Sequence, residues 1–144
     1  MILLSSALEL IRNDIIMNIL IVDAASNEIF LMLIIDKNIY TRRHENSKIN
    51  YEKLIVLVNN FLMLNKSSLN KIKTIYVNRG PGSFAGIRNS IAMIKALFLT
   101  KKIDYYCFSF SDFDDLNKVK YRNLPQLCKK YKIKKNLINP IYLS

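Results

Sequence analysis

The sequence predicts an α/β fold, a mixed five-stranded sheet with helices on its faces. The first observation is the order of its apolar patterns, which run strand, strand, strand, helix, strand, helix, strand along 144 residues. The second is a hydrophobic content of 51%, which at this length is enough to build the core of one domain. The third is that all three glycines fall between Gly80 and Gly86, which marks one tight junction between a strand and a helix.

Three strands begin this order. Aliphatic runs at residues 18–22 and 29–35 are typical of buried strands, and residues 39–43 indicate a third, more exposed strand. Small and polar residues at 23–27 and 36–38 separate the three runs. Connections this short join neighbouring strands, so we expect an antiparallel meander.

Two helices alternate with the last two strands. Apolar positions recur at helical spacing in residues 51–64 and 87–99. The strands are expected at residues 73–77 and 103–110, on either side of the second helix. This order suits a mixed five-stranded sheet with helices packed on its faces.

A third helix is expected at residues 111–131, with Ser111 or Asp112 as its N-cap and a break at Pro125. Residues 17–113 therefore form the main domain, and residues 114–144 form a basic helical remnant with an apolar tail. Residues 1–16 are interpreted as an N-terminal extension. Charged residues interrupt their apolar pattern, so we expect neither a signal peptide nor a membrane span, as in a cytoplasmic protein.

The inventory of reactive side chains is small. His44 is the only histidine, and Cys107 and Cys128 are not spaced as a metal knuckle. This argues against a zinc site, a Ser-His-Asp triad or a Cys-His pair, and we expect no metal or cofactor. Two cysteines without a disulfide framework fit a reducing compartment.

The net charge of +11 has two interpretations. One is attraction to a polyanion such as RNA, and the other is a solvated face in a lysine-rich chain. The basic residues concentrate near the C-terminus with no acid between them: Lys118, Lys120, Arg122, Lys129, Lys130, Lys132, Lys134 and Lys135.

The glycine loop also has more than one interpretation. As a phosphate cradle it lacks the Lys-Ser/Thr pair of a P-loop and the spacing of a dinucleotide motif. As a structural turn, Gly80 and Gly82 supply positive φ, Pro81 stiffens the bend and Ser83 caps the following helix.

The segment from Arg79 to Arg88 resembles the signature Arg-Gly-Pro-Gly-Ser-Phe-Thr-Gly-Leu/Val-Arg of the TsaB (YeaZ) family, with Ala85 in place of Thr. That family belongs to the bacterial machinery that makes threonylcarbamoyladenosine in tRNA. The turn at Asp23 and the tail Asn139-Pro140-Ile141-Tyr142-Leu143 match it more loosely. The departures are Ala24 for a turn threonine, Asn50 for a histidine, Ser144 for an arginine, and a second lobe that looks almost wholly deleted.

The resemblance implies a ribonuclease H-like half-domain of the actin-like ATPase superfamily. It implies a non-catalytic pseudoenzyme subunit that binds the catalytic subunit TsaD as a heterodimer, with a TsaE-like ATPase as a further partner and tRNA contact through the basic segment. The implied interface is the glycine loop with its helix, where Phe84 is an anchor and Arg79 and Arg88 are donors. Its residues are Arg79, Gly80, Pro81, Gly82, Ser83, Phe84, Gly86 and Arg88.

Other interpretations stay open beside this one. The apolar stripe with Leu57 and Phe61 has two interpretations. It packs in the core, or the apolar residues that the core does not need form a helical bundle with a partner or with a second copy of the chain. Asp23 and Ser26 hold one side of a nucleotide site, or Asp23 only ends the strand and caps the turn. The chain is alternatively a repurposed paralogue that binds RNA or itself; a peptidase or an ATPase is less favoured without the second lobe.

Overall fold

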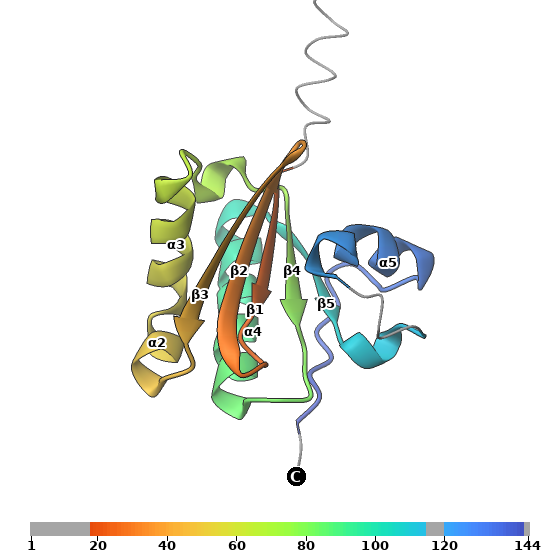
Figure 1. The fold of residues 1–144 in the computed structure, drawn as a ribbon. Coiled ribbons are helices and arrows are strands. Elements are labelled where there is room, and N and C mark those ends of the chain that lie inside the picture. Colours follow the sequence, from red (N-terminus) through yellow and green to blue (C-terminus); the bar gives the residue numbers. More distant parts are fainter. Residues whose placement is uncertain (1–17, 115–119, 143–144) are drawn as a thin grey trace, which may run out of the picture.

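The computed structural model describes residues 18–114 and 120–142, and it contains the predicted sheet (Figure 1). The strands lie in the order β3-β2-β1-β4-β5, with β1, β2 and β3 antiparallel and β4 and β5 parallel to β1. This confirms the mixed five-stranded α/β sheet. The strands are β1 (Asn18–Asp23), β2 (Glu28–Ile35), β3 (Asn38–Glu45), β4 (Thr74–Asn78) and β5 (Asp104–Phe108).

One face of the sheet is covered by the helical layer, which consists of α2 (Lys48–Glu52), α3 (Leu54–Leu64) and α4 (Phe84–Lys101). Inward-pointing residues of all three helices join the main hydrophobic core with side chains of the strands. The expected helix at 51–64 is two helices that meet at Lys53, and it begins earlier because the Ser47 hydroxyl accepts a hydrogen bond from the Asn50 N–H.

The opposite face is covered by the first part of the C-terminal segment (residues 120–142), which includes a 3₁₀ turn (Tyr121–Asn123) and α5 (Leu124–Lys130). Leu124 and Cys128 of α5 are buried against this face of the sheet. Further along the segment, Ile138 packs against Ile87 and Ile91 of α4.

The single helix expected at residues 111–131 is wrong where the structure describes it. A short 3₁₀ turn (Phe110–Asp112) is capped by Ser109, rather than by Ser111 or Asp112. Pro125 lies in the first turn of α5 instead of breaking a helix, because that turn needs no hydrogen bond from its N–H. The expected extension at residues 1–16, Lys118 and the last two residues lie outside the described residues.

The tail of the C-terminal segment runs along the edge of β5. Asn136 donates its N–H to the Tyr105 carbonyl oxygen at 2.8 Å and accepts the Tyr105 N–H through its side chain at 2.9 Å. Further on, the Ile141 N–H donates to the Arg79 carbonyl oxygen at 2.8 Å. The tail therefore brings residues from the end of the chain to the glycine loop. Within the described ranges, no helix has the length and apolar character needed to cross a lipid bilayer.

Candidate functional site

The glycine loop lies between β4 and α4, at the end of the sheet where β1 also ends. Asn78 is buried and organises it: its Oδ1 accepts the Gly80 N–H at 2.9 Å, and its Nδ2 donates to Asp23 Oδ1 at 3.2 Å. Gly80 has a φ of 105°, which few other residues adopt cheaply. One buried amide thus ties the loop to the turn after β1.

The other two glycines are needed for space rather than for positive φ. A Cβ at Gly82 would lie 2.1 Å from the Ala25 carbonyl oxygen, and one at Gly86 would lie 1.7 Å from the Ala24 carbonyl oxygen. The prediction of positive φ at Gly82 is wrong, because the loop instead passes directly against the turn that follows β1. Both glycines are used in packing within this chain.

Ser83 caps α4, as predicted from its place before the helix. Its hydroxyl accepts the Gly86 N–H at 3.1 Å, which satisfies one of the free donors of the first turn. The Ser83 N–H donates to the Ala25 carbonyl oxygen at 2.9 Å, so the cap is itself fixed to the β1–β2 turn.

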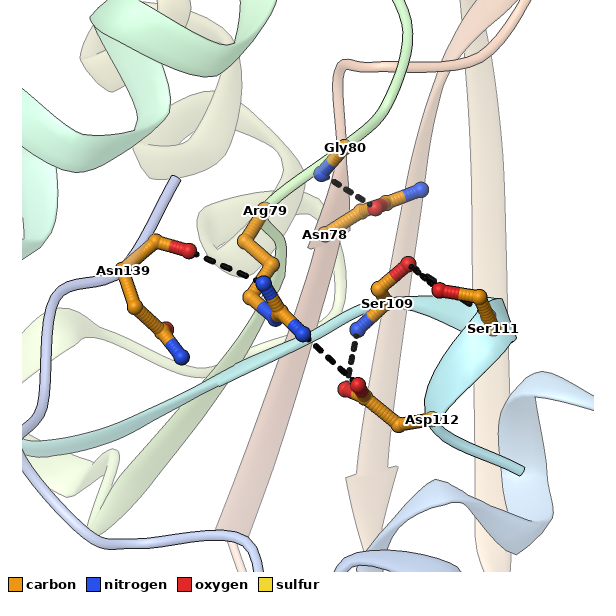
Figure 2. Close-up of polar contacts among 7 residues, drawn as sticks. All are labelled: Asn78, Arg79, Gly80, Ser109, Ser111, Asp112 and Asn139. Carbon is orange, nitrogen blue, oxygen red and sulfur yellow. Dashed lines mark hydrogen bonds and ion pairs between the residues drawn. The ribbon is translucent and has the colours of Figure 1, made fainter. Parts of the chain in front are cut away.

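Arg79 is committed to its own chain, in contrast to the expected role as a donor for a partner (Figure 2). Its guanidinium binds Asp112 Oδ1 at 2.6 Å and donates to the Asn139 carbonyl oxygen at 3.0 Å. Both charged side chains are about 15% exposed, and Asp112 Oδ2 accepts the Ser109 N–H at 2.8 Å. Arg79 therefore joins the loop, the 3₁₀ turn after β5 and the tail.

Phe84 and Arg88 are the accessible side chains of the expected interface. Phe84 is 58% exposed, although Gly86 and Ile87 in the same helix turn are buried. Its ring lies 4.9 Å from that of Tyr142, and the Arg88 guanidinium lies 5.6 Å from its centre. An exposed aromatic ring with a neighbouring arginine is a composition typical of protein interfaces.

A groove of about 250 Å³ runs between α4 and the pair α2 and α3, close to this loop in the fold. The small exposed residues Ala92 and Ala96 form its α4 side, and Ile55 forms part of its other side. Of the two predicted residues of the stripe, Phe61 is 2% exposed and belongs to the core. Leu57 is half-buried and lies beside β3, away from this groove.

Asp23 is fully buried, and its carboxylate is engaged within the chain. Oδ1 accepts the N–H groups of Ala25 and Ser26, and Oδ2 accepts the Ser26 hydroxyl at 2.9 Å. Oδ2 also accepts the Tyr121 hydroxyl at 2.6 Å, and burial, with the Asp23 charge second, raises the pKa of Tyr121. The arrangement matches the interpretation of Asp23 as the cap of the turn, while its use toward a nucleotide stays a prediction.

Tyr121, Asn78 and Asp112 were missed by sequence reasoning. Asn78 carried a usable signal, because an Asn directly before a Gly-Pro turn is suited to bond the backbone of that turn. Asp112 carried a local signal only for its capping bond with Ser109, and the Arg79–Asp112 and Tyr121–Asp23 contacts carried none, because the fold alone brings these residues together.

The reactive side chains do not gather. Among residues 18–114 and 120–142, no group of three His, Cys, Asp or Glu side chains could hold a metal ion. Burial raises the pKa of the Cys107 thiol to about 11 and that of Cys128 to about 12, so both are neutral and poorly nucleophilic near pH 7.

No protein-family model and no curated protein sequence matches the chain. Among solved structures it is similar to YeaZ from Pseudomonas aeruginosa, with a TM-score of 0.59 and 19% identity over 65% of this chain and 44% of that one. It is also similar to a Pseudomonas aeruginosa protein described as having similarity to peptidase YeaZ, with a TM-score of 0.60 and 19% identity over 65% and 43%. The chain thus spans less than half the length of these neighbours, and it shares their fold, as the resemblance implied.

Proposed function

We propose that this chain is a TsaB-like, non-catalytic subunit that binds a TsaD-like catalytic subunit in tRNA threonylcarbamoyladenosine synthesis. One observation carries the proposal: the signature from Arg79 to Arg88 stands at the same strand-to-helix junction that the resemblance requires, on a fold shared with YeaZ. The fold or the motif alone would be weaker support, because one fold hosts many functions.

The outer surface of the helical layer supports a protein partner. Exposed apolar side chains occur on all three of its helices and at the start of α4, which is unusual for a small monomer. They are Ile49, Ile55, Val56, Met63, Leu64, Phe84, Phe98 and Leu99. A partner that packs helices against the groove between α3 and α4 would cover part of this surface, including Ile55, whereas Met63 and Leu64 line a separate hollow beside β3.

The absence of turnover in the isolated chain is part of the proposal. Asp23, the carboxylate best placed to meet a nucleotide, already accepts hydrogen bonds from Ala25, Ser26, Asn78 and Tyr121. Its use in binding a cation that a nucleotide carries would first require Tyr121 to leave. We therefore assign the chain a scaffold role, in the cytoplasm, with self-association as the substitute when the partner is missing.

The test is co-purification with the TsaD-like protein of the same organism. We expect a stable heterodimer, weakened by Phe84→Ala by about 2 kcal/mol or more if the ring is a buried anchor in the complex. Ala92→Gln should weaken it too by filling the groove, whereas Lys95→Gln, at an exposed α4 position outside the groove, should not.

Gly82→Val is unsuitable as a probe of the interface, because its side chain would collide with the Ala25 carbonyl group of the same chain. A correctly folded chain that ignores this partner would refute the proposal. Binding that survives both Phe84→Ala and Ala92→Gln would place the partner elsewhere.

A further inference from the structure

The outer surface of the C-terminal segment is basic and has no role in the proposed heterodimer. Residues 120–142 contain no Asp or Glu. Among described residues, the ion pair found for this segment is that of Lys135 with Asp104, at 3.8 Å. Its basic side chains are all exposed: Lys120, Arg122, Lys129, Lys130, Lys132, Lys134 and Lys135.

A hollow of about 530 Å³ opens on this surface, between α5 and the sheet. Tyr76 of β4, which is 7% exposed, and the half-buried Tyr106 of β5 form its sheet side, because they are direct neighbours in the parallel register. Their rings are stacked, with centres 5.1 Å apart and planes inclined by 11°. Gln126, Lys129 and Lys132 line the same hollow from α5 and the residues that follow it.

These side chains combine the chemistry that recognises a nucleotide. Aromatic rings stack on bases, lysines neutralise phosphates, and an amide forms hydrogen bonds with base edges or ribose. Burial, followed by the neighbouring Cys128 and Tyr106, raises the pKa of Tyr76, so its hydroxyl stays a neutral donor. The lysine-rich character of the whole chain explains exposed charge anywhere, but it does not explain a tyrosine-walled hollow beneath two of the lysines.

We propose that this hollow binds an unpaired nucleotide of single-stranded RNA, with the base against the half-buried ring of Tyr106, which stacks on the buried Tyr76, and the flanking phosphates at Lys129 and Lys132. Gln126 and the Tyr76 hydroxyl are the groups available to the ribose 2′-hydroxyl, which distinguishes RNA from DNA. A membrane surface is a poorer match, because a flat anionic layer would meet the lysines and leave the hollow empty.

The test uses the full chain and a fluorescent oligouridylate of about ten nucleotides, titrated by anisotropy across a series of salt concentrations. The double variant Lys129→Ala/Lys132→Ala should bind roughly tenfold more weakly near 0.1 M salt and reduce the slope of log K against log salt by about 1.4. The matched control is Lys37→Ala/Lys48→Ala, which removes the same charge at exposed positions in the β2–β3 turn and at the start of α2, neither of which lines the hollow.

A second readout requires no variant of the aromatic pair. An oligonucleotide with a single 2-aminopurine should lose fluorescence on binding if its base stacks in the hollow. Equal weakening by the two double variants would overturn the site, as would unchanged 2-aminopurine fluorescence in a saturated complex.

Equal affinity for the matching DNA would overturn the assignment to RNA. Tighter binding to phosphatidylserine vesicles, with the same dependence on Lys129 and Lys132, would assign the surface to a membrane instead. None of these outcomes depends on the TsaD-like partner.

Discussion

The two faces of the sheet are covered by layers whose outer surfaces differ in kind. The helical layer buries one face beneath α3 and the long helix α4, and exposes apolar side chains such as Val56 and Leu99 on its outside. The C-terminal segment buries the other face with the short α5, and exposes lysines. A sheet of five strands therefore separates a layer that exposes apolar side chains among polar ones from a layer that is basic, and these surfaces suit the proposed protein partner and the proposed RNA, respectively.

The layers also differ in how they are held to the sheet. The helical layer is fixed through backbone contact, where Gly82 and Gly86 let the start of α4 touch the β1–β2 turn. Around α5 the C-terminal segment is held by side chains, namely Leu124 and Cys128 in the core and the Tyr121 hydroxyl on Asp23, and only its tail adds backbone hydrogen bonds, to Tyr105 and Arg79. We expect damage to the first kind of attachment to unfold the domain and damage to the second to loosen one layer.

The largest effect is expected from Gly86→Val. The new Cβ would lie 1.7 Å from a backbone oxygen that cannot rotate away, so α4 must move off the turn. We expect a loss of about 3 kcal/mol or more in the free energy of unfolding, measured by urea denaturation. Lys95→Val, an exposed change on the same helix, should cost only its helix propensity, less than about 1 kcal/mol. Equal losses in the two variants would show that the close approach does not matter.

Tyr121→Phe should have a smaller effect, confined to the C-terminal segment. It removes the hydroxyl that donates to the buried carboxylate of Asp23 and keeps the ring stacked 4.1 Å from Phe30. A hydrogen bond to a charged group of this kind is worth about 1–3 kcal/mol. Tyr131→Phe is the control, because the Tyr131 hydroxyl has no hydrogen-bond partner among the described residues. The measurement is the thermal unfolding of both variants. If Tyr121→Phe and Tyr131→Phe lower the melting temperature equally, the hydrogen bond to Asp23 does not hold the C-terminal segment on the sheet.

The difference between the layers also shows which features could be predicted from the sequence. The strands of the sheet follow from aliphatic runs, and Ser83 as a helix cap follows from its place before α4, because both signals are local. The helical layer was predicted except for the division at Lys53. The C-terminal segment was predicted poorly, because its short elements depend on the sheet face that they cover.

The residues of the candidate site also fall into those that a local sequence pattern predicts and those whose contacts only the fold sets. Phe84 could be selected from the motif, but the internal use of Arg79 could not, because Asp112 lies 33 positions away in the sequence. The bond between Asp23 and Tyr121 spans 98 positions and has no local pattern. The three glycines marked the right place, whereas the reason for two of them is a pair of carbonyl oxygens that only the folded chain brings close.

Alkaline pH should weaken the attachment of both layers to the sheet. One neutral thiol, Cys107, is buried beneath the helical layer, and the other, Cys128, is buried between α5 and the sheet. Burial raises the pKa of Cys107 to about 11 and burial, with Asp112 second, raises that of Cys128 to about 12. Thiols in the unfolded chain ionise at lower pH, so this stabilisation is complete below about pH 9 and is lost as pH rises toward the folded values. Each thiol accounts for about 1.4 kcal/mol per pH unit at most. Cys107→Ala and Cys128→Ala should each reduce the fall in the free energy of unfolding between about pH 9 and the folded pKa values, as measured by urea denaturation at a series of pH values.

The smallest expected effect is a difference in thiol reactivity between the two layers, which can be measured without changing the stability of the whole domain. In single-thiol variants, Cys128 reports on opening of the C-terminal segment and Cys107 on opening of the core beneath the helical layer. A segment held by one short helix should open more often, so Cys128 should react faster with a thiol reagent at pH 8 despite its higher pKa. Tyr121→Phe should accelerate Cys128 and leave Cys107 unchanged. If Cys107 accelerates equally, the two faces open together and the C-terminal segment is not a separate unit.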